Sequence, residues 1–428
     1  MIECFPEYIF QINFLKKKAF PDTVSQMMNL IKKLLLVFSL LFLFVIILKS
    51  PISETTNIGT GDYRPYWSAT YLLAHGQDFS NPGLMDGIER TLTNWNKPFT
   101  MMAWFAPTGM VILLPFTILP FKQAAFFWLL TNILVLSSAT MLIWSDVKRK
   151  IWIPLLAVFG FPMTLLSLYV GQINTLVLFG LIVFISLKKP EHHYLRGIGL
   201  ALTTIKPHLV ILSLPLIILD SIYKKHWKIL IGFFGSLLVC VIILFAFLPS
   251  WPISFWNLVI SGMSTIRETP TLSGLLAYTA GKSWGKWIWV LSLLLTISLW
   301  SFREKTWNEK LMIDVSLIIG LLISPIGWGY DQILLTIPIV NLFKTIFTYE
   351  EPKTRSIFFV VFLFAIYFIT YIMRVYSINE MWFFLVPILL GGLYCYYIFA
   401  YSNEIKINNF LYYYFDKILK KIKGGFTN

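Results

Sequence analysis

Residues 228–248 read KILIGFFGSLLVCVIILFAFL, and the only charge in this stretch is on its first residue, Lys228. About 20 consecutive apolar residues are needed to cross the roughly 30 Å of hydrocarbon in a bilayer. Comparable apolar runs recur from Leu30 to the C-terminal region. A backbone in lipid must satisfy its own hydrogen bonds, and the alternating pattern of a membrane barrel is absent, so we expect helices. The sequence therefore predicts an all-α, polytopic integral membrane protein.

The composition of the whole chain favours the same fold class. Of its 428 residues, 57% are hydrophobic and 13% are charged, whereas soluble domains carry about 25% charged residues. The net charge of +14 does not indicate nucleic-acid binding, because Lys and Arg gather in short clusters between the apolar runs. That distribution is the one that sets membrane topology.

The three cysteines, Cys4, Cys240 and Cys395, are far apart in the sequence. They provide neither a disulfide framework nor metal-ligand spacing. No cluster of His, Cys, Asp and Glu in the sequence requires a metal either. We therefore expect neither a metal nor a bound cofactor.

The basic clusters predict an orientation for the spans. We expect residues 1–27 to be a cytoplasmic lead-in, residues 28–400 a single transmembrane domain, and residues 401–428 a cytoplasmic basic tail. The first apolar run, at about 30–48, lacks a small-residue cleavage site, so we predict a retained helix. About twelve spans result, with both termini on the cytoplasmic side of the plasma (inner) membrane. The spans expected after the first are 122–144, 151–169, 172–187, two short halves of 197–219, 228–248, 285–301, 311–323, 331–346, 357–373 and 381–400.

A long loop, residues 49–121, follows the first predicted span on the outer face. Its last part, residues 101–120, is apolar and rich in proline. If that part crossed the membrane, the basic cluster at 146–150 (DVKRK) would lie outside, against the positive-inside rule. We therefore expect residues 101–120 to form juxtamembrane or re-entrant helices.

Four polar segments fall on the same predicted outer face. They are Gly61–Trp67 (GDYRPYW), Gly171–Asn174 (GQIN), Lys206–His208 (KPH) and Ser324–Gln332 (SPIGWGYDQ). Polar and ionisable groups at membrane depth are expensive and usually face an internal cavity. The sequence therefore predicts that these segments share an outward-facing cavity.

Each polar residue has a structural interpretation beside the functional one. Asp62 is either a loop residue or helix N-cap, or a general base for a hydroxyl group. Lys206 is either a lysine that reaches the membrane interface or, with His208, a cation and donor for a lipid phosphate. Gln172 and Asn174 are either amides that bond helices together or substrate ligands. Tyr330 and Asp331 lie at a Pro/Gly-rich break that also fits a simple turn.

The order and spacing of these segments resemble glycosyltransferase family 87, a group of integral membrane transferases with the GT-C fold. The resemblance covers roughly residues 28–345. Its residues are Asp62-Tyr63, Tyr66-Trp67-Ser68-Ala69, Leu72-Leu73-Ala74-His75-Gly76, Asn81-Pro82, Pro107, Leu113-Leu114-Pro115-Phe116, Leu119-Pro120-Phe121, Ala125, Trp128, Gly171-Gln172-Ile173-Asn174, Ile205-Lys206-Pro207-His208, Ser324-Pro325, Trp328 and Asp331.

The resemblance implies a membrane hexosyltransferase. Members are similar to the enzymes that mannosylate phosphatidylinositol mannosides, use a polyprenyl-phosphate sugar as donor, and act on a lipid or glycan acceptor. An acidic residue in the first outer loop is taken as catalytic base in the family, which here corresponds to Asp62. The substrate-binding residues that we predict are Arg64, Tyr66, Gln172, Asn174, Lys206, His208, Trp328, Tyr330 and Asp331. Relatives often carry a histidine where Gly327-Trp328-Gly329-Tyr330 stands here.

The lipid-linked donor is a co-substrate that already carries its leaving group, so no nucleotide fold is needed. The absence of a Gly-rich phosphate-binding motif agrees with this. A flippase or other transporter of lipid-linked sugars is the main alternative, but transporters often show two related halves with broken helices at the midplane. The polar segments here lie at one face, which favours an enzyme. A scaffold protein would leave Asp62 and Lys206 without a function.

Overall fold

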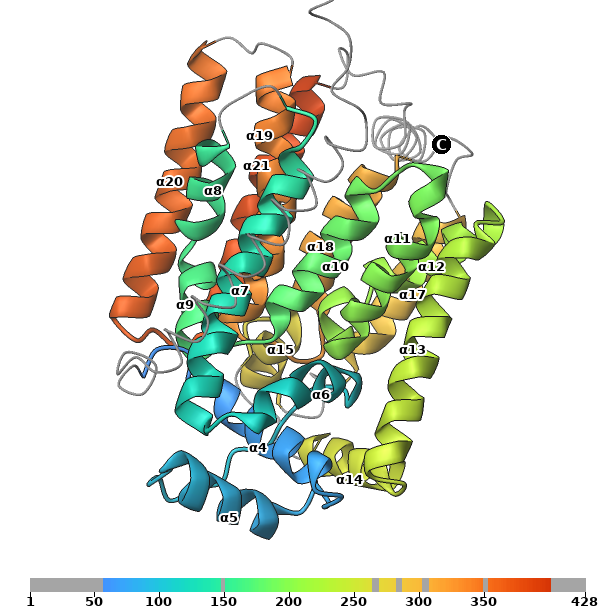
Figure 1. Cartoon of the computed structure of the whole chain (residues 1–428). Coiled ribbons are helices and arrows are strands. Elements are labelled where there is room, and N and C mark those ends of the chain that lie inside the picture. Colours follow the sequence, from blue (N-terminus) through green and yellow to red (C-terminus); the bar gives the residue numbers. More distant parts are fainter. Residues whose placement is uncertain are drawn as a thin grey trace, which may run out of the picture. The chain divides into compact units, whose positions relative to one another are not determined.

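The structure is a computed structural model that describes residues 57–147, 151–263, 269–281, 287–301, 308–348 and 353–401. Every regular element in these ranges is a helix (Figure 1), so the predicted all-α class is confirmed. The first predicted span at 30–48, the lead-in at 1–27 and all but the first residue of the tail at 401–428 lie outside the described residues.

Four helical segments in the described residues are long and apolar enough to cross a membrane. They are α7 (Phe121–Trp144), α13 (Trp227–Phe247), residues Ser356–Val375 of α20 (Lys353–Val375), and Glu380–Tyr397, which joins η6 (Glu380–Phe384) to α21 (Leu385–Tyr401). α8 (Trp152–Phe159) and α9 (Pro162–Val170) meet at 67° and together count as a fifth candidate. The chain is therefore a membrane protein.

The expected number of about twelve spans is not confirmed, because several predicted spans are short helices. These are α10 (Asn174–Ser186), α11 (His193–Leu202), α12 (Ser213–Tyr223), α17 (Ile288–Ser301), α18 (Glu309–Ile323) and α19 (Thr336–Thr348). The predicted break at 206–208 is present between α11 and α12, where η3 (Thr203–Ile205) and η4 (Pro207–Val210) replace regular helix. Pro207 accounts for the interruption because proline lacks the backbone donor that a helix requires.

The predicted outer loop contains short helices. α4 (Tyr63–Ala74) is followed by α5 (Pro82–Thr93), whose start is fixed by the Asn81 side chain, which accepts hydrogen bonds from Gly83 N and Leu84 N. Proline at the first helical position fits this start. α6 (Thr108–Leu113) and η1 (Leu114–Ile118) are too short to cross a bilayer, which agrees with the non-spanning interpretation of residues 101–120.

Figure 1 shows α4, α5, α6 and α14 (Trp251–Met263) at one end of the long helices. In the same view α15 (Leu272–Thr279) lies farther from that end, among the long helices. One backbone hydrogen bond ties the predicted outer loop to the rest of the chain, and a second hydrogen bond closes the loop on itself. Ala106 N donates to Ile205 O over 2.9 Å, and the buried Glu89 carboxylate accepts from Met101 N over 3.0 Å. The loop is thereby tied to the chain just before Lys206.

Glycines allow three helices to pack closely. A Cβ atom on Gly180 of α10 would lie 2.2 Å from Gly199 O of α11, and one on Gly197 of α11 would lie 2.1 Å from Ile229 O of α13. Small residues that let backbones approach are typical of helix contacts in membranes. These contacts hold α10, α11 and α13 together as neighbours.

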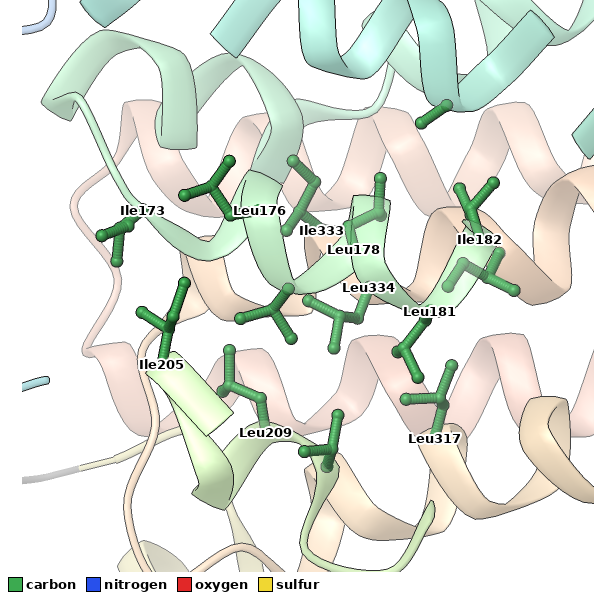
Figure 2. Packing of buried hydrophobic residues seen from close by; sticks show 14 of the residues in the cluster. Ile173, Leu176, Leu178, Leu181, Ile182, Ile205, Leu209, Leu317, Ile333 and Leu334 are labelled. Carbon is green, nitrogen blue, oxygen red and sulfur yellow. The ribbon is translucent and has the colours of Figure 1, made fainter. Parts of the chain in front are cut away.

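α10 lies at the centre of this packing. Figure 2 shows its buried aliphatic side chains, among them Leu178, Leu181 and Ile182, beside Leu317 of α18 and Leu334 of η5 (Gly329–Leu335). Because α10 is covered on nearly all sides, the residues at its first turn are also interior. The segment 171–174 is therefore placed inside the protein rather than on a lipid-facing surface.

Candidate active site

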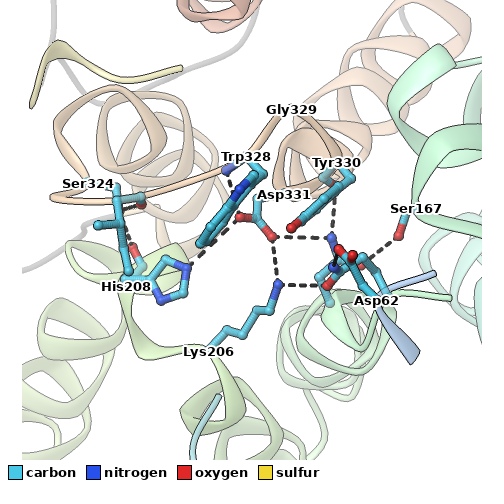
Figure 3. Close-up of polar contacts among 12 residues, drawn as sticks. Asp62, Ser167, Lys206, His208, Ser324, Trp328, Gly329, Tyr330 and Asp331 are labelled. Atoms are coloured by element: carbon cyan, nitrogen blue, oxygen red, sulfur yellow. Dashed lines mark hydrogen bonds and ion pairs between the residues drawn. The ribbon is translucent and has the colours of Figure 1, made fainter. Parts of the chain in front are cut away.

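The structure brings the four polar segments together in one network of hydrogen bonds and ion pairs (Figure 3). Asp62 directly precedes α4, the amides come from the α9–α10 turn, and the cation comes from the break between α11 and α12. The second carboxylate comes from η5. The residues that take part are Asp62, Tyr66, Gln172, Asn174, Lys206, His208, Tyr330 and Asp331.

The turn between α9 and α10 depends on Gly171. This residue has a φ of +75°, in the left-handed region that favours glycine. A Cβ atom there would lie 2.2 Å from Gly59 O. Trp128 Nε1 donates to Gly171 O over 2.9 Å and fixes the turn against α7. The chain can therefore reverse here and direct Gln172 into the interior.

The Gln172 amide connects three side chains. Its Oε1 accepts from Tyr66 OH over 2.9 Å and from Lys206 Nζ over 2.8 Å. Its Nε2 donates to Asp62 Oδ2. Since Gln172 is fully buried, these protein groups are its surroundings, and the amide links Asp62 to Lys206.

Lys206 and Asp331 form a buried ion pair. Lys206 Nζ lies 3.0 Å from Asp331 Oδ1, and each side chain is only 2% exposed. Asp331 Oδ2 also accepts from Trp328 N over 3.0 Å, and Asn174 Nδ2 lies 3.4 Å from Oδ1. The interpretation of Lys206 as a lysine that reaches the interface is therefore wrong, because its ammonium group is inside the protein.

The network approaches the surface at half-buried side chains. Asp62, His208, Trp328 and Tyr330 are all half-buried. His208 Nε2 is 4.0 Å from Asp331 Oδ2 and is buried without a hydrogen-bond partner among the described residues. The Trp328 and Tyr330 rings stack with centroids 6.0 Å apart and planes 10° apart. These four side chains are more exposed than Tyr66, Gln172, Asn174, Lys206 and Asp331, which are buried.

Asp62 occupies the N-cap position of α4, but its side chain makes no capping hydrogen bond. It is directed instead to Gln172, whose Nε2 donates to Asp62 Oδ2. Burial raises the pKa of Asp62 above its ordinary value, while the hydrogen bond from Tyr330, the charge of Lys206 and the hydrogen bond from Gln172 act in the opposite direction. A carboxylate with a raised pKa is a better proton acceptor near neutral pH.

Arg64 is not brought to this network. Its guanidinium group hydrogen bonds to the Thr93 backbone and hydroxyl oxygens and lies 4.8 Å from the ring centroids of Trp95 and Phe121. On a helix, residues four apart share a face and residues two apart do not. Tyr66 therefore lies on the side of Asp62, whereas Arg64 points toward α5. The structure therefore does not bring Arg64 to the network, and its role in substrate binding stays a prediction.

Glu380 and Arg374, which the sequence analysis did not single out, support the site from outside the network. Glu380 Oε1 accepts from Gly329 N over 2.6 Å, and Arg374 Nη1 pairs with Glu380 Oε2 at 3.0 Å. They hold the segment that carries Trp328, Tyr330 and Asp331. Ser167 is a further residue that the sequence did not single out, and its Oγ donates to Asn174 Oδ1 over 2.6 Å. The sequence indicates this contact only through the spacing of seven residues, about two helical turns, between Ser167 and Asn174.

Among the described residues, no group of three or more His, Cys, Asp and Glu side chains is arranged to hold a metal ion. The chemical groups in the network are two carboxylates, one ammonium, one imidazole and two amides, together with tyrosine hydroxyls. Such a set can accept a proton, balance a negative charge and orient hydroxyl groups.

A helical membrane fold with a buried ionisable network behind half-buried aromatic residues is typical of a membrane protein that acts on a polar group. Comparison with family models identifies the class: the chain belongs to glycosyltransferase family 87, whose model matches residues 105–325, just over half of the chain. It is therefore a membrane glycosyltransferase, with a sugar donor and an acceptor as substrates. No curated protein and no solved structure matches the chain.

The matched segment contains Gln172, Asn174, Lys206 and His208. Asp62 lies before it, and Tyr330 and Asp331 lie after it. The network thus joins residues from the matched segment with residues from both sides of it.

Proposed function

We propose that this protein transfers a hexose, with mannose as the expected sugar, from a polyprenyl-phosphate donor to a lipid or glycan acceptor. The reaction takes place on the outer face of the plasma membrane, both termini are cytoplasmic, and Asp62 is the general base. The observation that supports this proposal is the network that joins the half-buried Asp62 to the buried Lys206 and Asp331.

In this mechanism Asp62 accepts the proton of the acceptor hydroxyl, whose oxygen attacks the anomeric carbon of the donor sugar. The bond between that carbon and the phosphate oxygen breaks, and the polyprenyl phosphate leaves with its negative charge. We expect inversion at the anomeric carbon because the acceptor displaces the phosphate in one step. The position of Asp62 at the edge of the network suits proton transfer, which requires hydrogen-bond reach.

Lys206 and His208 are the groups that balance the charge of the departing phosphate. Lys206 is fully surrounded by protein, and a fixed charge in a water-poor site acts more strongly than one in water. The His208 side chain is half-buried. Its Nε2 has no hydrogen-bond partner in the part of the chain that the structure describes, and we propose that it donates to a phosphate oxygen. The stacked Trp328 and Tyr330 rings offer an apolar face to the sugar.

The test is transfer of radiolabelled sugar from a panel of polyprenyl-phosphate donors into lipid extract by the purified protein in nanodiscs. We expect Asp62→Asn to lower the transfer rate by about 100-fold or more, because a positioned base contributes about that much. Asp78→Asn is the matched control. Asp78 lies in the same outer loop, is also half-buried, and bonds only to groups outside the network.

Wild-type rates in folded Asp62→Asn protein would remove Asp62 from the chemistry. If the wild-type protein transferred no sugar from any donor but moved donors between liposome leaflets, the flippase alternative would replace the proposal.

A further inference from the structure

The surroundings of the Gln172 amide determine which way it faces. A lysine ammonium can only donate hydrogen bonds, and Lys206 Nζ lies 2.8 Å from one end of the amide. That end must therefore be the oxygen, Oε1, which also accepts from Tyr66 OH at 2.9 Å. The amide nitrogen is left to face Asp62.

This orientation has a consequence for Asp62. An amide NH₂ group is a donor only, so the Asp62 oxygen that it meets, Oδ2, must be an acceptor. A proton on Oδ2 would place two donors against each other. A proton on Oδ1 would leave Oδ2 a carbonyl oxygen, which accepts a weaker hydrogen bond than a carboxylate oxygen does. Gln172 therefore favours the carboxylate form of Asp62, and the charge of Lys206 is what keeps Gln172 in the orientation that does so.

The other described polar groups around Asp62 come from three elements. On its own helix, Tyr66 bonds to Gln172, and Arg64 is directed to Thr93. From η5, the Tyr330 hydroxyl lowers the pKa of Asp62, and the negative charge of Asp331 raises it. From the α11–α12 break, Lys206 favours the charged form, while His208 lies against Asp331 rather than Asp62.

We infer that Gln172 is a positioning residue, not a substrate ligand: it couples the Lys206 charge to Asp62 and keeps Asp62 Oδ2 as a hydrogen-bond acceptor. The importance of Gln172 for the reaction rests on the proposed function, in which Asp62 is the general base. Its structural part, the effect of Gln172 on Asp62, is measurable without any substrate.

The first experiment follows Asp62 protonation directly. Infrared difference spectra of the purified protein are recorded over pH, and the Asp62 carboxyl band is assigned by its loss in Asp62→Asn. In Gln172→Ala we expect the protonation midpoint to move up by about one pH unit, the effect of losing one hydrogen bond to a charged group. The acid limb of the pH profile for sugar transfer should move by the same amount, with the KM for the donor unchanged.

Gln172→Glu separates this role from simple packing. The side chain keeps nearly the same size, so a residue that only fills space would tolerate Glu better than Ala. If Gln172 is a positioning residue, Glu should not be tolerated better than Ala. Glu would place a third carboxylate near Lys206, beside those of Asp62 and Asp331. We expect the midpoint in Gln172→Glu to rise at least as far as in Gln172→Ala, and this variant also serves if Gln172→Ala does not fold.

Thr175→Val is the matched control. Thr175 is fully buried three residues further along the same segment, and its hydroxyl bonds to Asn132 on α7, away from the network. It should leave the midpoint unchanged.

An unmoved midpoint in both Gln172 variants would overturn the inference, whatever happened to their rates. That result would not affect the role of Asp62 as base. The reverse case is recognisable as well: a shifted midpoint together with full transfer by Asp62→Asn would sustain the coupling and refute the proposed function of Asp62.

Discussion

At the scale of single residues, the site depends on a buried ion pair. Removing either partner alone would leave the other as an unpaired buried charge. Lys206 and Asp331 are each 2% exposed, so the protein has removed both charges from water. The cost of that removal is offset only while the two remain together, with Asn174, Gln172 and the Trp328 backbone completing their hydrogen bonds.

We predict that Lys206→Met destabilises the protein by about 3–5 kcal/mol, because it leaves Asp331 buried without a cation. The double variant Lys206→Met, Asp331→Asn should recover most of that loss while remaining inactive. Thermal unfolding in nanodiscs measures both. The control is Lys224→Met, whose partner Asp220 lies four residues away in a more exposed pair and whose loss should cost less than about 1 kcal/mol. Equal effects of the Lys206 and Lys224 variants would contradict the prediction.

Sequence patterns could identify these residues as candidates but not their partners. Lys206, Gln172 and Asp331 stand out because polar groups interrupt apolar runs. Helix packing decides which of these residues contact one another, and no local sequence pattern indicates that packing. Arg64 shows this limit: it lies between Asp62 and Tyr66 in a polar segment, yet the turn of α4 directs it to Thr93. Glu380 shows the converse, since nothing near it in the sequence indicates Gly329 as its partner.

At the scale of elements, close glycine contacts set the distances between the helices that carry the site. A Cβ atom on Gly232 of α13 would lie 2.4 Å from Tyr194 O of α11, whereas one on Gly235 of the same helix would meet nothing within 4 Å. α11 leads directly into the segment that holds Lys206. A displacement of α11 therefore moves Lys206 relative to the α9–α10 turn.

We predict that Gly232→Ala destabilises the protein by about 1–3 kcal/mol through overpacking and lowers sugar transfer with it. Gly235→Ala should be neutral or slightly stabilising, because alanine favours a helix by up to about 1 kcal/mol over glycine. Thermal unfolding and transfer assays on the two variants, three residues apart, test this directly. A Gly232→Ala protein as stable and active as Gly235→Ala would contradict it.

Element boundaries were well predicted where the apolar run and its flanks were clear. The span expected at 228–248 is α13 at Trp227–Phe247, and the break expected at 206–208 is present. The 67° bend between α8 and α9 was not predicted. Pro162 marks a place where helix hydrogen bonding is interrupted, but the direction and size of a bend depend on the neighbours, here including Tyr367, whose hydroxyl bonds to Ala157 O.

At the scale of the whole molecule, the orientation in the membrane follows from where the charges lie. Lys97, in the outer loop between α5 and α6, and Lys189, between α10 and α11, are both exposed. In the proposed topology, which follows the positive-inside pattern, they lie on opposite sides of the membrane.

We predict that a cysteine at Lys97→Cys reacts with a membrane-impermeant maleimide in intact cells, and that one at Lys189→Cys reacts only after permeabilisation. The background protein has Cys4, Cys240 and Cys395 replaced by serine, and this cysteine-free protein is the control for labelling of other groups. Labelling of both positions from the same side would contradict the proposed topology.

The contacts that close the network join very distant parts of the chain. Gln172 is 110 residues after Asp62, and Tyr330 is 156 residues after Asn174. A ribosome that adds about 5–20 residues per second therefore releases the α9–α10 turn many seconds before η5. During that interval Lys206 has no Asp331 to pair with. We therefore expect the active site to be among the last parts of the protein to form during its synthesis, and chains that end before η5 to be targets for membrane quality control.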